Sequence, residues 1–192
     1  MDRQIMWSPI RWPGAEHLWV CRDSTGVVAD GLVIAVLDDG SPVRVSYEVV
    51  CDDAWRTRRV SVDVHGGPSV ALLCGDDGRW REPGGGERTE LAGCVDVDIA
   101  LTPYTNTLPI RRLQLQPGES ADIRTVYVRF EPTLTVTTSE QRYTRLDSDA
   151  DTVYGFRSGA FEAELPVDAD GVVIDYPGLW NRSYPASSAI GA

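Results

Sequence analysis

The sequence predicts a mainly β protein, built as one large curved antiparallel sheet or an unclosed barrel with few short helices. Three observations support this fold class. Short runs of alternating apolar and polar residues recur along the chain, as expected for half-buried strands. Turn signals such as Asp39-Gly40 and Pro117-Gly118 separate these runs, and no long segment has helical periodicity. Many short strands in sequential hairpins favour a sheet that curls on itself or nearly closes.

The strands can be assigned in order from the alternation and from the turns between them. Residues 26–37 form an apolar run and residues 42–50 alternate, so the two should pair as a hairpin around Asp39-Gly40. Residues 55–64 also alternate, with arginines at one end of the apolar face. A helical turn or two is expected either at Thr107–Leu113 or near Pro177. The other expected strands are residues 17–22, 70–73, 79–81, 94–101, 123–130, 134–138, 141–146, 153–157, 160–165 and 172–176.

The chain is expected to fold as a single domain. With 192 residues, of which 42% are hydrophobic, it can bury a sizeable core, and neither a linker nor an internal repeat interrupts the pattern. We therefore expect one β domain over residues 1–182. The last ten positions, residues 183–192, hold small and polar side chains and a proline, which predicts a loosely ordered tail.

Composition argues against several classes of function. A net charge of −11 disfavours a nucleic-acid binder, because phosphate contacts need clustered cations, and it disfavours docking on anionic lipid. No apolar run reaches the roughly 18 residues that a membrane span needs. The N-terminus has no secretory signal pattern and the cysteines have no CxxC spacing, so we expect reduced thiols and a cytoplasmic location. With two histidines far apart, His17 and His65, no metal site and no cofactor are expected.

Residues 93–113 gather more polar side chains of different kinds than any other stretch. The first half alternates as a strand, so Asp96 and Asp98 should share one face, about 6–7 Å apart at a rise of roughly 3.3 Å per residue. A segment bracketed by Pro103 and Pro109 follows directly. The polar residues of this segment and of the run after it are Thr102, Thr105, Asn106, Thr107, Arg111 and Arg112.

Four interpretations of the two aspartates are open. Paired with Arg111 and Arg112, they would pin the crossover at residues 102–109 to the sheet. As metal ligands, they would need further oxygens converging on one point. As acid and base of a glycosidase, they would need a separation of about 5–9 Å, which any D-x-D strand provides. No Ser-His-Asp set or nucleophile elbow accompanies them, so we assign no catalytic residue. Finally, they could form the polar rim of a ligand cavity in a curved sheet.

Six sequence blocks carry a resemblance to a known family. They are PGAEHL at 13–18, ADGLVI at 29–34, CDDAWRTRRV at 51–60, GCVDVDIALTPYTNTLPIRRL at 93–113, QRYTRL at 141–146 and VDADGVVIDYPGLW at 167–180. In these blocks the chain resembles the bacterial family described as "putative glycolipid-binding" proteins, formerly a domain of unknown function. The blocks span nearly the whole chain in the order of the family, and the long central block is the most specific.

The resemblance implies a single β domain similar to the bacterial lipoprotein carriers, an unclosed barrel with an apolar concave face, and a glycolipid ligand. Those carriers work in the periplasm, whereas no export signal is apparent here, so a cytoplasmic ligand is expected. Our hypothesis is a non-enzymatic binder of an amphipathic molecule such as a glycolipid. The alternatives are a carboxylate-dependent hydrolase of a glycoside or ester, and a structural or homodimeric interaction protein without a small ligand. The expected ligand-binding residues are Trp55, Arg58, Asp96, Asp98, Thr105, Asn106, Arg111, Arg112 and Tyr143.

Overall fold

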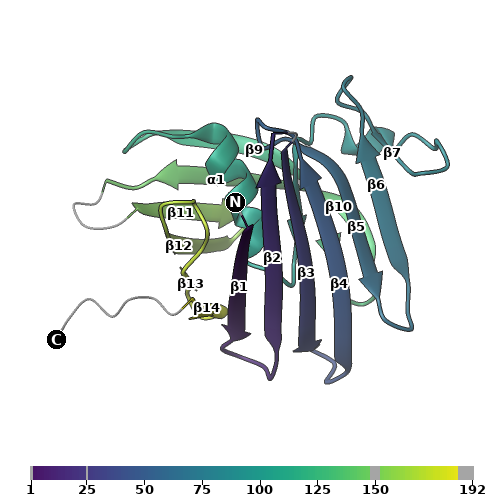
Figure 1. Ribbon diagram of the computed structural model, residues 1–192, viewed down its shortest axis with the longest axis horizontal. Helices are drawn as coiled ribbons and strands as arrows, with labels where there is room; N and C mark the ends of the chain where they lie inside the picture. Colours follow the sequence, from purple (N-terminus) through teal and green to yellow (C-terminus); the bar gives the residue numbers. More distant parts are fainter. Residues whose placement is uncertain (1, 25, 148–151, 186–192) are drawn as a thin grey trace.

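The computed structural model describes residues 2–24, 26–147 and 152–185. A large antiparallel sheet of nine strands occupies one side of the molecule, in the order β13-β14-β1-β2-β3-β4-β5-β6-β7. Strands β1 to β7 follow one another as hairpins, because alternating runs are separated by short turns (Figure 1). The strands of this sheet are β1 (Asp2–Pro9), β2 (Ala15–Asp23), β3 (Gly26–Val36), β4 (Pro42–Cys51), β5 (Thr57–Val64), β6 (Ser69–Cys74), β7 (Trp80–Arg81), β13 (Asp175–Tyr176) and β14 (Trp180–Tyr184).

A second sheet of five strands has the order β12-β11-β10-β9-β8. Its pairs are antiparallel except that β8 runs parallel to β9. A parallel pair needs a crossover connection, and the helical segments η2 and α1 lie in it. The elements of this half of the chain are η1 (Thr89–Leu91), β8 (Asp96–Ile99), η2 (Tyr104–Asn106), α1 (Thr107–Leu113), β9 (Ser120–Arg129), β10 (Thr135–Arg145), β11 (Thr152–Ser158) and β12 (Phe161–Val167).

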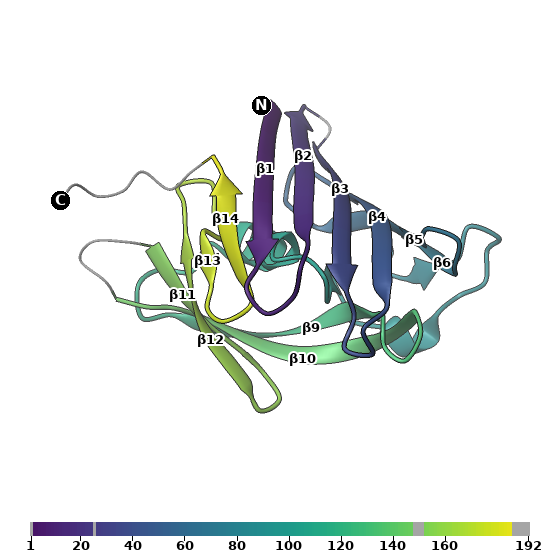
Figure 2. The ribbon, with the colours of Figure 1, turned by 90° about the horizontal axis from the view of Figure 1, so that it is seen from below.

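The two sheets curl around a shared core and leave the barrel open. Figure 2 shows β9 and β10 running across beneath β1 to β4, with the helical crossover between the two sheets. The core fills the space between them, and the tryptophans Trp7, Trp80 and Trp180 are among its largest fully buried side chains. Two of them also tie segments together, since the Trp7 indole donates to the Val173 carbonyl and the Trp80 indole to the Cys94 carbonyl. The predicted fold class, mainly β with a curved open sheet and few helices, is confirmed.

The structure corrects several boundaries. The strand expected from residue 55 begins at Thr57, because Trp55 has a φ of 64° and the Asp52 carboxylate closes a tight turn around it. Residues 141–146 were expected to continue the strand 134–138 beyond a bend, and the structure has one uninterrupted strand, β10, instead. Of the tail expected at residues 183–192, Ser183 and Tyr184 belong to β14, which pairs with β1, and residues 186–192 lie outside the described residues. In the described part of the chain, no helix has both the length and the apolar character needed to cross a bilayer.

Candidate functional site

The polar segment after β8 is buried between the two sheets. The chain leaves β8 at Ile99, turns, and enters η2 and then α1, which has the bounds expected from the sequence. Thr102, Thr105, Asn106 and Thr107 are all buried. Because buried polar groups need partners, this crossover is held by side-chain hydrogen bonds as well as by apolar packing. The two aspartates of the preceding strand β8, Asp96 and Asp98, have different kinds of hydrogen-bond partner.

Asp96 is a structural anchor. Its side chain is fully buried, and the Arg112 guanidinium donates from Nε to both carboxylate oxygens at 3.0 and 3.2 Å and from Nη2 to Oδ2 at 2.6 Å. Burial raises the pKa of Asp96, and the hydrogen bonds and charge of Arg112 oppose that rise. The pair fixes α1 on β8, as the structural interpretation predicted for one of the two aspartates. Asp96 is therefore closed to a substrate, and the two aspartates do not form an acid–base pair.

Asp98 has only neutral partners. Thr105 donates its hydroxyl to Oδ1 at 3.3 Å, and Gln141 on β10 donates its amide to Oδ2 at 2.6 Å. Burial raises the pKa of Asp98, and these two hydrogen bonds oppose the rise. Among the ion pairs of the described ranges, none involves Asp98. A carboxylate offers about four lone-pair sites, so it retains capacity to accept further hydrogen bonds.

Asn106 is fixed beside Asp98 by β10. Tyr143 donates its phenolic hydroxyl to Asn106 Oδ1 at 2.9 Å, and the Asn106 amide donates to the Pro103 carbonyl at 3.2 Å. One amide hydrogen of Asn106 is left over after these contacts. The structure thus brings four of the predicted residues together, namely Asp98, Thr105, Asn106 and Tyr143.

A half-open groove of about 390 Å³ lies next to Asp98 and Asn106. Its lining residues come from β8, β9, β11, β12, β13 and β14 and from the segment between β8 and α1. Phe156, Phe161 and Tyr176 form an aromatic cluster with ring centroids 6.1–6.3 Å apart. We call this site the Asp98 groove and define it by Asp98, Asn106, Tyr127, Phe156, Phe161, Tyr176 and Trp180.

Comparison with known proteins assigns the chain to a family. A family described as "Putative glycolipid-binding" matches residues 4–182. The chain belongs to this family. The crystal structure of a DUF1089 family protein from Pseudomonas aeruginosa is similar, with 34% sequence identity and a TM-score of 0.75 over 87% of this chain and 91% of that chain. Among curated proteins, none matches the sequence.

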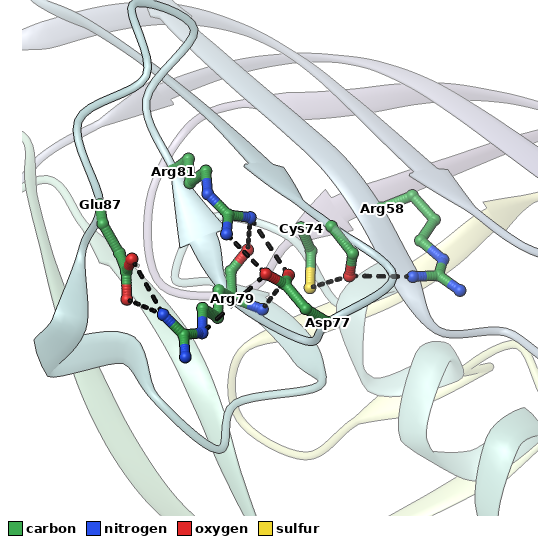
Figure 3. Close-up of polar contacts among 7 residues, drawn as sticks. Arg58, Cys74, Asp77, Arg79, Arg81 and Glu87 are labelled. Atoms are coloured by element: carbon green, nitrogen blue, oxygen red, sulfur yellow. Dashed lines mark hydrogen bonds and ion pairs between the residues drawn. The ribbon is translucent and has the colours of Figure 1, made fainter.

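The remaining predicted residues of this family member lie in other clusters. Arg58 binds Asp52 through Nε at 3.0 Å and donates to the Gly75 carbonyl at 3.2 Å. Figure 3 shows Arg58 beside the end of β6, next to a network formed by Asp77, Arg79, Arg81 and Glu87. Trp55 and Arg111 contact each other, with the guanidinium carbon 5.2 Å from the ring centroid, and line a different cavity. Arg112 is committed to Asp96.

Sequence reasoning missed a buried carboxyl group, Glu16. It is fully buried on β2, and Oε1 accepts hydrogen bonds from Tyr47 at 2.5 Å and from Thr102 at 2.6 Å. Oε2 has no partner. Burial raises the pKa of Glu16 to about 8, although both hydroxyl donors lower it. A signal was present in the sequence, because Glu16 is in phase with the apolar residues Leu18 and Val20.

The position of Tyr47 depends on a glycine in the neighbouring strand. Gly31 lies directly opposite Tyr47, and a Cβ at Gly31 would be 2.1 Å from the tyrosine ring. We expect Gly31→Ala to lower the free energy of unfolding by about 1–3 kcal/mol, because the ring must move away from Glu16. Urea denaturation followed by circular dichroism measures the change.

Gly155→Ala is the matched control, since Gly155 also lies within a strand. A Cβ there would meet its nearest neighbour, Leu146, at an ordinary distance of 3.5 Å. We expect this variant to be neutral or to gain about 0.4–1 kcal/mol through the lower entropy of the unfolded chain. Equal destabilisation by both substitutions would contradict the role assigned to Gly31.

Proposed function

We propose that this protein binds the sugar head group of an amphipathic ligand, such as a glycolipid, in the Asp98 groove, without catalysing a reaction. The observation that carries the proposal is the combination of clustered aromatic rings with a carboxylate and an amide in one half-open site. Aromatic faces offer apolar area to the C–H face of a sugar ring. Carboxylate and amide groups offer the hydrogen bonds that sugar hydroxyls need.

The size and the wall of the groove fit this role. Ligand sites usually measure about 300–1,000 Å³, and the volume of about 390 Å³ lies in that range. Phe161 is 42% exposed at the rim, so a ligand would cover apolar surface that now contacts water. The name of the matched family supports the same class of ligand. Of the predicted binding residues, Asp98 and Asn106 would contact the sugar, while Thr105 and Tyr143 would orient them.

Binding is tested by isothermal titration with octyl β-glucoside and dodecyl β-maltoside below their critical micelle concentrations. Phe161→Ala is expected to weaken binding about tenfold, since one aromatic contact contributes on the order of 1 kcal/mol beyond its buried area. Leu73→Ala is the matched control, because Leu73 is 41% exposed and lies on β6. It should leave the affinity unchanged.

Asp98→Asn is the second variant, because it keeps the shape of the side chain and removes its negative charge. We expect it to weaken binding as well, while Asp122→Asn at an exposed site on β9 does not. Native mass spectrometry after incubation with a bacterial lipid extract provides an independent measurement. The proposal fails if neither glycoside produces heat and no lipid is retained.

We also propose a cytoplasmic location and consider a homodimer, as expected from the sequence. A cytoplasmic location is checked by fractionating cells that produce the protein at its natural level. Homodimerisation through a sheet edge is checked by sedimentation velocity, and a monomer over the whole working concentration range would contradict it.

A further inference from the structure

A second pocket adjoins the Asp98 groove. It measures about 410 Å³, and Ala100 and Tyr127 line both this pocket and the groove. Trp12 of the pocket also contacts Trp180 of the groove, with ring centroids 5.6 Å apart. The two sites therefore meet along Ala100 and Tyr127 and form one longer depression. We call the second site the Trp12 pocket and define it by Trp12, Asp38, Leu101, Tyr127, Arg129 and Glu131.

The walls of the Trp12 pocket are held by contacts between segments that are distant in sequence. Asp38 lies in the turn between β3 and β4, and its backbone N–H donates to the Glu131 carboxylate at 2.6 Å. Figure 2 shows this turn beside the ends of β9 and β10. Ile10, in the turn that carries Trp12, donates its backbone N–H to the Leu179 carbonyl at 2.9 Å. The pocket is thus preorganised, which lowers the entropic cost of binding an occupant.

Opposite charges line this pocket without pairing. Arg129 is exposed on β9, and within residues 2–24, 26–147 and 152–185 its guanidinium makes neither a hydrogen bond nor an ion pair. Asp38 and Glu131 line the same pocket, and no ion pair of the described ranges joins either carboxylate to Arg129. Guanidinium donors and carboxylate acceptors are therefore available in one small space. A ligand that both donates and accepts can bridge them.

The hydroxyl group of Tyr127 is available at the junction of the two sites. Tyr127 is half-buried on β9, and its hydroxyl makes no hydrogen bond to the part of the chain that the structure describes. A phenolic hydroxyl can donate one hydrogen bond and accept another. Since Tyr127 lines both sites, this hydroxyl can contact a ligand where it passes from the groove into the pocket.

The mixed lining of the Trp12 pocket favours a sugar ring over an alkyl chain. An alkyl chain would remove Arg129, Asp38 and Glu131 from water without pairing them, and the burial of unpaired charges is costly. A sugar ring has hydroxyls that pair with such groups, and its C–H face can pack on an indole. Trp12 and Leu101 are both half-buried and offer the apolar area for that face. The pocket therefore has the same kind of lining as the groove, in which aromatic rings accompany a carboxylate.

We propose that the head group of the ligand contains at least two sugar units, the first in the Asp98 groove and the second in the Trp12 pocket. The second ring packs against Trp12, and its hydroxyls bridge Arg129 and Glu131. The bond between the two rings passes Ala100, whose small side chain leaves room at the junction. This inference rests on the proposed function of the groove, and it narrows the ligand class to a glycolipid with a di- or oligosaccharide head group.

The test compares octyl β-glucoside, octyl β-maltoside and octyl β-cellobioside by isothermal titration with the full chain, below their critical micelle concentrations. The three share one alkyl chain, so a difference in affinity measures the contribution of the second ring. Maltoside and cellobioside differ in the α or β linkage of that ring. At least one of them is expected to bind about tenfold more tightly than the glucoside, because the second ring gains an aromatic contact and a charge-assisted hydrogen bond.

Two variants locate the second ring. Arg129→Gln should remove most of the tenfold preference and leave the affinity for octyl β-glucoside unchanged, since Arg129 lines the pocket and not the groove. Val36→Phe narrows the pocket from the end of β3 and should have the same effect. Arg157→Gln is the matched control, because Arg157 is also exposed but lines neither site. Thermal unfolding of each variant shows whether it is folded.

Two results would overturn this inference and leave the proposed function standing. In the first, octyl β-glucoside binds and Phe161→Ala weakens it, but neither disaccharide glycoside binds more tightly. In the second, a disaccharide glycoside is preferred, but Arg129→Gln and Val36→Phe both leave the preference unchanged, so the second ring lies elsewhere. If none of the three glycosides binds, the proposed function fails and this inference fails with it.

Discussion

Replacing Arg112 by alanine is expected to lower the free energy of unfolding by about 3–5 kcal/mol, because it leaves the Asp96 carboxylate buried without a counter-charge. Asp96 is fully buried, while Arg112 keeps 19% of its side chain exposed and binds both carboxylate oxygens. The loss is thus mainly the cost of an unpaired buried charge. Urea denaturation followed by tryptophan fluorescence measures it.

An exposed ion pair provides the control. Arg142 and Asp122 lie 2.7 Å apart, but their side chains are 39% and 71% exposed. Arg142→Ala should cost less than about 1 kcal/mol, since water screens the pair. The double variant Asp96→Leu/Arg112→Leu removes both buried charges and should be more stable than Arg112→Ala alone. If the double variant is the less stable of the two, the unpaired charge is not the cause.

Glu16 is expected to make the protein less stable as pH rises from about 5 to about 8. Its pKa is raised from 4.5 to about 8 in the folded protein, so over this range the unfolded chain releases a proton that the folded chain keeps. The folded state then binds more protons than the unfolded state, and stability falls by up to about 1.4 kcal/mol per pH unit. Well below pH 4.5 the carboxyl group is protonated in both states and contributes no slope.

Glu16→Gln removes this titration while leaving an oxygen that accepts from Tyr47 and Thr102. As pH rises from about 5 to about 8, we expect the free energy of unfolding of the original protein to fall relative to that of the variant. Glu162→Gln, at an exposed position on β12, should give a curve parallel to that of the original protein. Parallel curves for Glu16→Gln as well would mean that Glu16 is ionised in the folded state.

Local sequence patterns predicted much of the fold. Alternation located most strands, and pairing of Asp96 and Asp98 with Arg111 and Arg112 was one of the four interpretations of residues 93–113, which the structure bears out for Asp96 and Arg112. Helix α1 occurs at the first of the two places where a helical turn was expected. These features depend on neighbours in sequence, for which period and turn chemistry are informative. Two other features depend on strands that are distant in sequence: the parallel pairing of β8 with β9 and the division into two sheets. Alternation does not tell which of these strands will pair with the free N–H and C=O groups along each strand edge.

The candidate site likewise combines residues that are close in sequence with residues from distant strands. Asp98 and Asn106 stood out in one short segment, but the Asp98 groove is also lined by Tyr127, Phe161 and Tyr176, which come from separate strands. Alternation tells which face of a strand a residue is on, yet not what covers that face. Both faces of β8 are covered, so Asp96 is fully buried where a strand with one solvated face would have exposed it. Glu16 was overlooked because its partners Tyr47 and Thr102 lie far along the chain.

The pairing of β14 with β1 determines when the Asp98 groove can form during synthesis. The first strand of the large sheet has an unpaired edge until the chain has been made past Tyr184, because β13 and β14 are the last strands to appear. The same two strands provide Tyr176 and Trp180 to the Asp98 groove. A growing chain can form its hairpins from β1 to β7 early, since these contacts are local. It acquires the groove only when its C-terminal segment returns to its N-terminal strand, so the presence of the groove reports a completed fold.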